Sequence, residues 1–318
     1  MFPERQAPTV IRIIIRRVAA SVLVALGVLT IIFIVVRIVP GDPAALILGA
    51  GATHAQIEQL RTSLGLNQPL IVQYAEFMVN ALRFNFGTSY RLGGDAMAQV
   101  LQALPATLLL AATAMALVLL FSTVAGVAAA RRPGTFRDRA ISGGAMVLQS
   151  LPQFWVGILL IIVVSGMWHL LPSGGYGSPL NLVLPAITMA VSFLGMLTKM
   201  VRNSSLEQAG EGFVQTARAK GMSEQRLFYV HILRNGLLPV VTLAGLVLGV
   251  FLGSAVVIET VFAWPGVGRL LIESILNRDY PVVEAAVFVF ALIYIALNLV
   301  VDLLYGLIDP RVRVAVTA

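Results

Sequence analysis

The sequence predicts an all-α integral membrane protein with six transmembrane helices, and composition and patterning both support this fold class. Of its 318 residues, 58% are apolar and only 12% are charged, about half the charged share of an ordinary soluble domain. The mean hydropathy is +0.90, and runs of apolar residues long enough to cross a bilayer recur along the chain. A chain with so little polar surface cannot cover a soluble globule. Cysteine is absent, which excludes disulfides and thiolate metal sites.

The first apolar run extends from Val18 to Val36 without a charge, and an amphipathic lead-in precedes it. The run is longer than the apolar core of about 7–15 residues in a cleaved signal peptide. It ends in Arg37 and Pro40 rather than at a small-residue cleavage site. We therefore expect a retained span over residues 11–39.

Five further runs predict spans at about 104–130, 140–171, 182–198, 237–258 and 282–304. The run at 140–171 is too long for one straight crossing, and Pro152 within it permits a kink or a short entry helix. Acidic residues near span ends include Glu259 and Asp302, which are the candidates for functional polar groups. Either water or a basic neighbour satisfies them, or they are functional polar groups in the membrane.

Basic residues predict the orientation of the spans. With the N-terminus in the cytoplasm, sixteen of the 22 Lys and Arg residues fall in inner segments and six fall outside. Cytoplasmic segments carry such an excess of Lys and Arg, so both termini are expected inside. The basic residues are divided among four short segments, whereas a nucleic-acid surface would gather them on one face. Topology therefore accounts for the net charge of +7.

The outer stretch 40–103 carries helix signals of its own. Thr53 and Gln56 form a capping-box pattern ahead of an apolar run at helical spacing, and Gly65 is typical of a helix stop. Pro69 then opens a second amphipathic stretch. These signals predict a small helical insertion on the outer membrane face. It is either a plain packing element or a docking platform for a soluble partner.

The inner stretch 199–236 is longer than a simple connection between spans needs to be. Val214 to Lys220 predicts a short helix, Gly221 suits a left-handed C-cap, and Ser223 can cap the next helix. The residues alone leave two interpretations open. The stretch is a docking site for a cytoplasmic protein, or it is a solvated basic loop.

Short motifs occur in order along nearly the whole chain. They are Pro40-Gly41-Asp42-Pro43, Leu64-Gly65-Leu66-Asn67-Gln68-Pro69-Leu70, Gln73-Tyr74, Leu104-Pro105-Ala106-Thr107-Leu108, Thr216-Ala217-Arg218-Ala219-Lys220-Gly221-Met222-Ser223, Leu233-Arg234-Asn235-Gly236-Leu237-Leu238-Pro239, Glu259-Thr260-Val261-Phe262-Ala263-Trp264-Pro265-Gly266-Val267-Gly268-Arg269-Leu270, Arg278-Asp279-Tyr280-Pro281 and Asp309-Pro310-Arg311-Val312-Arg313. In this order the motifs resemble those of the permease subunits of ABC transporters of the dipeptide and oligopeptide uptake type. The inner stretch has Gln215-Thr216-Ala217 where the general permease signature begins Glu-Ala-Ala.

The resemblance implies a single permease domain of the type I ABC importer fold in a bacterial inner membrane. It implies that the chain forms half of a translocation pathway together with a second, similar permease. Two cytoplasmic ATPase subunits and an extracytoplasmic binding protein that delivers peptide would complete the assembly. The ATPase contact would fall on Gln215, Thr216, Ala217, Arg218, Ala219, Lys220 and Gly221. The bent segment after the fifth span would supply outer gate or pathway residues, namely Glu259, Phe262, Trp264, Pro265 and Arg269.

Catalytic motifs are missing from the sequence. It contains no GxxxxGK[ST] phosphate loop, so ATP hydrolysis is expected on partner chains, and neither a cofactor nor a metal site is predicted. An ion-coupled secondary transporter acting without ATPase partners is the alternative function. A membrane anchor or receptor that transports nothing is a third. Secondary transporters usually place ionisable groups at the midplane, and these spans have few there.

Overall fold

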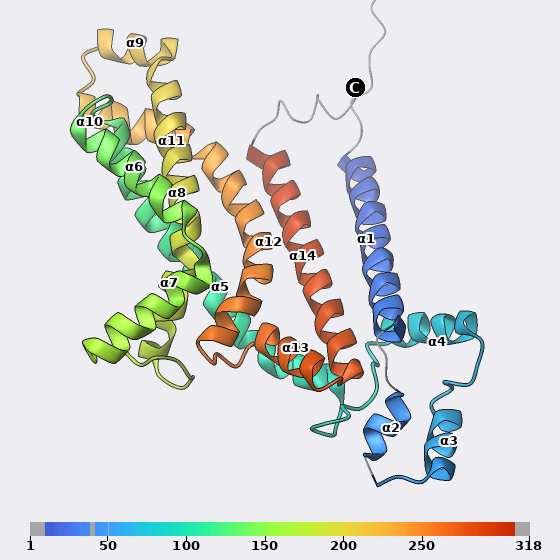
Figure 1. The fold of residues 1–318 in the computed structure, drawn as a ribbon. Coiled ribbons are helices and arrows are strands. Elements are labelled where there is room, and N and C mark those ends of the chain that lie inside the picture. The colour runs from blue at the N-terminus through green and yellow to red at the C-terminus, as the bar shows by residue number, and fades with distance from the viewer. Residues whose placement is uncertain (1–9, 39–41, 50, 309–318) are drawn as a thin grey trace, which may run out of the picture. The chain divides into compact units, whose positions relative to one another are not determined.

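The computed structural model describes residues 10–38, 42–49 and 51–308, and the regular elements in this part of the chain are helices joined by loops (Figure 1). Its only β-type pairing is an isolated bridge between Thr88 and Asp95. The elements are α1 (Val10–Ile38), α2 (Pro43–Leu48), α3 (His54–Ser63), α4 (Leu70–Leu82), α5 (Ala96–Ala130), α6 (Phe136–Ser150), α7 (Gln153–Leu160), the π-helix η1 (Ile161–Met167), α8 (Pro179–Ala209), α9 (Gly212–Ala219), α10 (Glu224–Arg226), the π-helix η2 (Leu227–Ile232), α11 (Leu233–Gly236), α12 (Leu238–Val261), α13 (Val267–Leu276) and α14 (Tyr280–Ile308).

Five helices are long and apolar enough to cross a membrane. They occupy Ala19–Ile38, Ala96–Ala130, Pro179–Ala209, Leu238–Val261 and Tyr280–Val301. The predicted third span is a broken pair instead. α6 and the segment Gln153–Met167 meet at an angle of 98°. The break falls at Leu151 and Pro152, because proline has no N–H to continue the hydrogen bonds of α6. Six spans are present if this pair counts as one.

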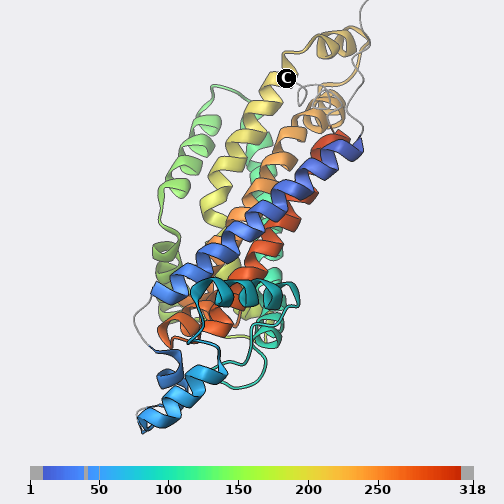
Figure 2. The ribbon, with the colours of Figure 1, turned by 90° about the vertical axis from the view of Figure 1, so that its right-hand side faces the viewer.

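The chain divides into two compact units, and the first contains residues 1–106 and 265–296. Its apolar core joins α1, α4, the start of α5, α13 and α14, with Phe33, Phe77 and Phe288 among its buried rings. α4 crosses the end of α1 in both ribbon views (Figures 1 and 2), and the hydroxyls of Thr30 and Tyr74 lie 2.8 Å apart at this crossing. The expected helical insertion is therefore packed onto the first span through α4.

The insertion begins and ends its helices where the sequence predicts. Thr53 and Gln56 form the capping box at the start of α3. Beyond the end of α3, Gly65 takes a left-handed backbone (φ +67°) and Leu66 N–H donates to the carbonyl of Arg61. α4 begins directly after Pro69. These local signals are confirmed because each depends only on neighbouring residues.

The second unit contains residues 107–264 and, among the described residues, 297–308. α8 packs against α6, α7, α11 and α12, and Figures 1 and 2 both show it beside α6 and α12. Small residues permit the close approach. A Cβ on Gly126 of α5 would lie 2.6 Å from Val201 Cβ of α8. Gly195 of α8 lies directly against the backbone of Ala145 in α6. α8 is the structural centre of this unit.

α8 is longer than the predicted fourth span at 182–198. It continues as one helix to Ala209, so the irregular part of the inner stretch begins at Gly210 rather than at Lys199. Polar residues mark where an apolar run stops, but they do not stop a helix, because residues such as Lys199 and Arg202 have good helix propensity.

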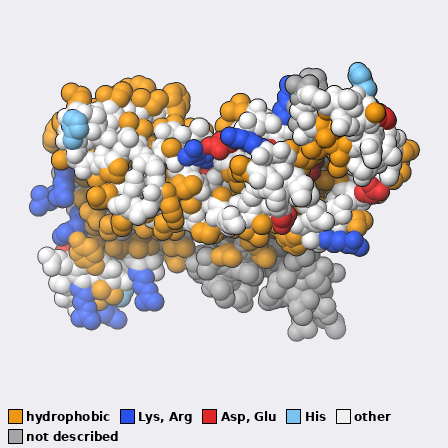
Figure 3. All heavy atoms as spheres, turned by 90° about the horizontal axis from the view of Figure 1, so that it is seen from below, with side chains coloured by type: hydrophobic (Ala, Val, Ile, Leu, Met, Phe, Trp, Pro, Cys, Tyr) orange, Lys and Arg blue, Asp and Glu red, His pale blue; other side chains and the backbone are white. Residues whose placement is uncertain are grey.

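Exposed apolar side chains are abundant in the described residues, as expected for helices that face lipid. Leu23, Phe121 and Val124 are examples, each more than half exposed. In the space-filling view, hydrophobic side chains cover much of the visible face, and charged side chains stand in separate groups among them (Figure 3).

Candidate functional site

The helix α9 carries most of the predicted coupling residues and stands beyond the end of α8, on the side away from α7 (Figure 1). Val214 is its one fully buried side chain and packs with Leu227 and Ile232 of η2. Ala217, one turn further along α9, is partly buried against the same cluster. Positions three apart lie on one helix face, so α9 rests on η2 through this face and presents the other outward.

The turn after α9 is a Schellman motif. Gly221 N–H donates to the carbonyl of Arg218 (3.0 Å) and Met222 N–H donates to that of Ala217 (3.2 Å). Gly221 has φ +80°, a conformation that residues with a Cβ rarely adopt. An added Cβ would meet nothing within 4 Å. Glycine is therefore favoured at position 221 because of the positive φ, and not because a side chain would lack space.

An ion pair closes the turn from the outside. Arg218 Nε and Nη2 donate to the two carboxylate oxygens of Glu224, at 2.6 and 3.1 Å. These hydrogen bonds raise the pKa of Arg218 and lower that of Glu224. Both side chains are more than half exposed, so solvent screens the pair and its contribution to stability is small.

The helix after the turn differs in detail from the prediction. Ser223 stands at the N-cap of α10, but its side chain makes no capping hydrogen bond. α10 is only three residues long and passes directly into the π-helix η2. A π-helix of this kind often occurs at functional sites.

The seven predicted coupling residues form one continuous surface of the second unit. Ala217 is partly buried, and the other six are exposed, namely Gln215, Thr216, Arg218, Ala219, Lys220 and Gly221. A surface of this kind, with small residues on a short rigid helix, can enter a groove of another protein.

Polar contacts fix the helices that support this surface. Arg202 of α8 donates through Nε (2.5 Å) and Nη2 (2.7 Å) to the carboxylate of Asp138 at the start of α6. Gly134 N–H donates to the same carboxylate at 2.9 Å. Asp138 is buried, and Arg202 is partly exposed. Sequence reasoning missed this pair because its members lie 64 positions apart.

Three of the five predicted pathway residues lie together in the second unit. Glu259, Phe262 and Trp264 are each no more than 1% exposed. Thr107 Oγ1 of α5 donates to Glu259 Oε1 at 2.6 Å. The ring of Phe262 lies close to Gly157 of α7, where an added Cβ would approach it to 3.1 Å. These three side chains form a packed cluster at the end of α12.

The Gly/Pro-rich break 172–179 covers this cluster. Gly175 N–H donates to the carbonyl of Phe262 at 2.9 Å, and the ring of Tyr176 meets that of Trp264 edge-on at 4.9 Å between centroids. Two residues beyond the end of α12, Ala263 lies in the left-handed region (φ +51°), an unusual conformation for a residue other than glycine. The segment is bent as expected. No sequence signal identified Ala263 as its strained point.

The other two predicted pathway residues belong to the first unit. Pro265 is exposed, and Arg269 Nε donates to Glu273 Oε1 at 2.7 Å. With Gln99 and Gln102 of α5 they line a cavity of about 440 Å³. Among the described residues, no group of three or more His, Asp or Glu side chains could hold a metal ion.

Comparison with known proteins gives consistent matches over nearly the whole chain. The family model described as "Binding-protein-dependent transport system inner membrane component" matches residues 122–314, and the corresponding N-terminal model matches residues 10–111.

Two curated relatives illustrate the match. The oligopeptide transport system permease protein AppB of Bacillus subtilis is 36% identical over 311 residues, with 94% of this chain and 98% of AppB covered. The glutathione transport system permease protein GsiC of Salmonella choleraesuis is 38% identical over 300 residues, with the same coverage.

A solved structure supports the fold. The crystal structure of an amino acid ABC transporter with histidines matches with a TM-score of 0.51 at 16% identity. The match covers 67% of this chain and 94% of that one.

Proposed function

Because the chain belongs to the family of binding-protein-dependent transport system inner membrane components, we propose that it forms half of the translocation pathway of an ATP-driven peptide importer. A second, similar permease supplies the other half. Two cytoplasmic ATPase subunits drive the cycle, and an extracytoplasmic binding protein delivers the cargo. Peptide as cargo is supported by relatives named for oligopeptide and glutathione transport.

The geometry of α9 supports the coupling role. The helix is anchored by one buried side chain, is ended by a Schellman turn and exposes six of the seven predicted contact residues. It is connected directly to α8, which continues as one helix through the membrane span. We assign ATPase docking to Gln215–Gly221 of this surface. Movement of an ATPase would then reach the spans through α8, by the rigid-body movement that alternating access requires.

Gly221→Val tests this assignment. Valine at φ +80° is strained by about 1–3 kcal/mol, so the turn should change its backbone and tilt α9. The variant should insert into membranes normally, bind the ATPase subunits more weakly and lose uptake in the assembled complex. Uptake, ATPase stimulation and subunit co-purification are the measurements.

Gly93→Val is the matched control. Gly93 also has a left-handed backbone (φ +69°) and open space around its Cβ position, but it lies in the outer insertion. Valine at position 93 should impose similar backbone strain without affecting α9, so the association with the ATPase subunits should stay normal. Normal uptake and ATPase binding in Gly221→Val would show that the coupling contact lies elsewhere.

The proposed topology places both termini and α9 in the cytoplasm, with 40–103 outside. The chain has no cysteine, so single introduced cysteines report directly on sidedness. Cysteine at Gly94 should react with a membrane-impermeant maleimide added outside intact cells, and cysteine at Gly210 only after the membrane is opened. Outside labelling at position 210 would contradict the topology.

The alternative of an ion-coupled transporter makes the opposite prediction in reconstitution. The purified chain in proteoliposomes with an ion gradient, but without ATPase subunits, should move no peptide. Gradient-driven peptide uptake by the chain alone would overturn the proposal.

A further inference from the structure

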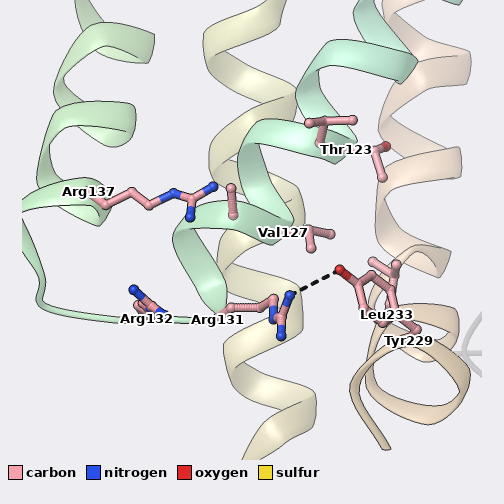
Figure 4. A pocket seen from close by; sticks show the side chains of 9 residues that line it. Thr123, Val127, Arg131, Arg132, Arg137, Tyr229 and Leu233 are labelled. Carbon is pink, nitrogen blue, oxygen red and sulfur yellow. Dashed lines mark hydrogen bonds between the residues drawn. The ribbon is translucent and has the colours of Figure 1, made fainter. Parts of the chain in front are cut away.

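A cavity of about 420 Å³ opens at the C-terminal end of α5, within the second unit (Figure 4). Its size falls in the range of small-molecule sites, about 300–1,000 Å³. Residues from the end of α5, the following loop, the start of α6, η2 and α11 line it, as Figure 4 shows. They are Thr123, Val124, Val127, Ala128, Arg131, Arg132, Arg137, Tyr229 and Leu233.

The polar part of the cavity is strongly cationic. Arg131, Arg132 and Arg137 contribute to its wall, and no acidic residue does. Asp138, the nearest acid in sequence, already receives two hydrogen bonds from Arg202. Among the described residues, the three arginines form no ion pair. Three unneutralised guanidinium groups around one cavity favour an anion.

Tyr229 holds one of these arginines in place. Arg131 Nη1 donates to the Tyr229 hydroxyl at 3.3 Å, as the dashed line in Figure 4 shows. The guanidinium also lies 5.6 Å from the centre of the tyrosine ring, within the range of a cation–π contact. The partner of Arg131 is a hydroxyl and an aromatic ring rather than a carboxylate, so the contact orients Arg131 without cancelling its charge.

The apolar part of the cavity continues along α5. Leu120, Val124 and Ala128 follow at helical spacing, and Leu120 and Val124 are 58% and 62% exposed. Phe121, 54% exposed, lies beside them. An exposed apolar stripe therefore leads along a membrane-spanning helix directly to the arginines.

An apolar stripe that leads to a cationic cavity matches one class of ligand, a molecule with an apolar chain and an anionic head. α5 is an apolar helix long enough to span the bilayer, and Arg131 follows its last residue. Because Ala96–Ala130 carries no charge and Arg131 is the first charged residue after it, a bilayer around α5 would bring the arginines to the level of lipid headgroups and the stripe to the level of acyl chains. A soluble anion would use the arginines but not the stripe.

We propose that this cavity binds the phosphate headgroup of an anionic phospholipid, whose acyl chain lies along Leu120 and Val124. The lipid joins the end of α5 to η2, which carries α9. The proposal depends on the membrane location of the chain and not on its transport function, so each can fail without the other.

Native mass spectrometry of the full chain in detergent tests the proposal, with phosphatidylglycerol and phosphatidylcholine of identical acyl chains as probes. The wild-type chain should retain phosphatidylglycerol at least about tenfold more than phosphatidylcholine. The variant Arg132→Gln/Arg137→Gln should lose this preference, and Arg132→Lys/Arg137→Lys should keep most of it. Both positions are exposed, so neither change should impair folding.

Arg226→Gln/Arg234→Gln is the control, because it removes the same charge from two exposed residues that do not line the cavity. It should keep the preference for phosphatidylglycerol. Equal retention of the two lipids by the wild-type chain would overturn the proposal, and so would equal loss in the cavity and control variants. Displacement of phosphatidylglycerol by inorganic phosphate at the same concentration would assign the cavity to a soluble anion instead.

Discussion

The crossing of α5 over α8 depends on Gly126, and a single methyl group tests it. In Gly126→Ala the new Cβ would lie 2.6 Å from Val201 Cβ, 2.7 Å from Val201 Cγ1 and 2.8 Å from the carbonyl oxygen of Thr198. Carbon atoms in contact normally stay about 3.5–4.0 Å apart. The two helices must therefore separate by roughly 1 Å, or Val201 must leave its place.

The size of the effect follows from two opposing contributions. Overpacking of this kind destabilises by about 1–3 kcal/mol. Alanine in a helix interior is better than glycine by about 1 kcal/mol. The net change for Gly126→Ala should thus be a loss of up to about 2 kcal/mol.

Gly144→Ala separates the two contributions. Gly144 lies in α6, and a Cβ there would meet nothing within 4 Å, so only the gain in helix propensity remains. The difference in unfolding free energy between the two variants should then equal the overpacking alone, about 1–3 kcal/mol. Denaturant titration of the purified chain in detergent, followed by tryptophan fluorescence, measures both.

A second change at the same contact distinguishes packing from other causes. Val201→Gly removes two of the three close atoms and leaves the Thr198 carbonyl. Because Val201 is buried, this change lowers stability by itself, but it should lower it less in the Gly126→Ala background than in the wild-type chain. Equal stability of Gly126→Ala and Gly144→Ala would refute the reasoning, because α5 and α8 would then not be in close contact at this point.

Two further predictions concern polar groups. Thr107→Val removes a donor from the buried Glu259 and should destabilise the chain by about 1–3 kcal/mol, whereas Thr113→Val, whose hydroxyl bonds only within its own helix, should change stability little in the same denaturant titration. Burial, reinforced by the nearby Glu284 carboxylate, raises the pKa of Tyr90 to about 12. The folded chain then keeps the Tyr90 proton to a higher pH than the unfolded chain, so the free energy of unfolding should fall between pH 10 and pH 12. Tyr90→Phe should reduce that fall. An alkaline stability profile unchanged by Tyr90→Phe would contradict the prediction.

Sequence reasoning succeeded where a feature depends on neighbouring residues. The capping box at Thr53, the left-handed glycines Gly65 and Gly221 and the break at Pro152 are all local, and each stands where the pattern placed it. The membrane fold follows from composition and apolar runs for the same reason.

The features that sequence reasoning missed depend on tertiary contacts. Thr107 and Glu259 are 152 positions apart, so no pattern links them. The strained Ala263 is held by the contacts of its neighbours Phe262 and Trp264, and its own side chain gives no sign of it. The continuation of α8 past Lys199 shows that a membrane boundary and a helix end are separate properties.

The length of α8 has a mechanical consequence. Pro185 removes one backbone hydrogen bond near the beginning of the helix, and no proline follows it up to Ala209. The stretch 186–209 is therefore a stiff arm about 36 Å long. A tilt of roughly 10° about Pro185 would displace the attachment point of α9 by roughly 6 Å. A small rotation about Pro185 thus becomes a displacement of several ångströms at α9, as in a lever arm. The stiffness of residues 186–209 determines how much of the rotation reaches α9.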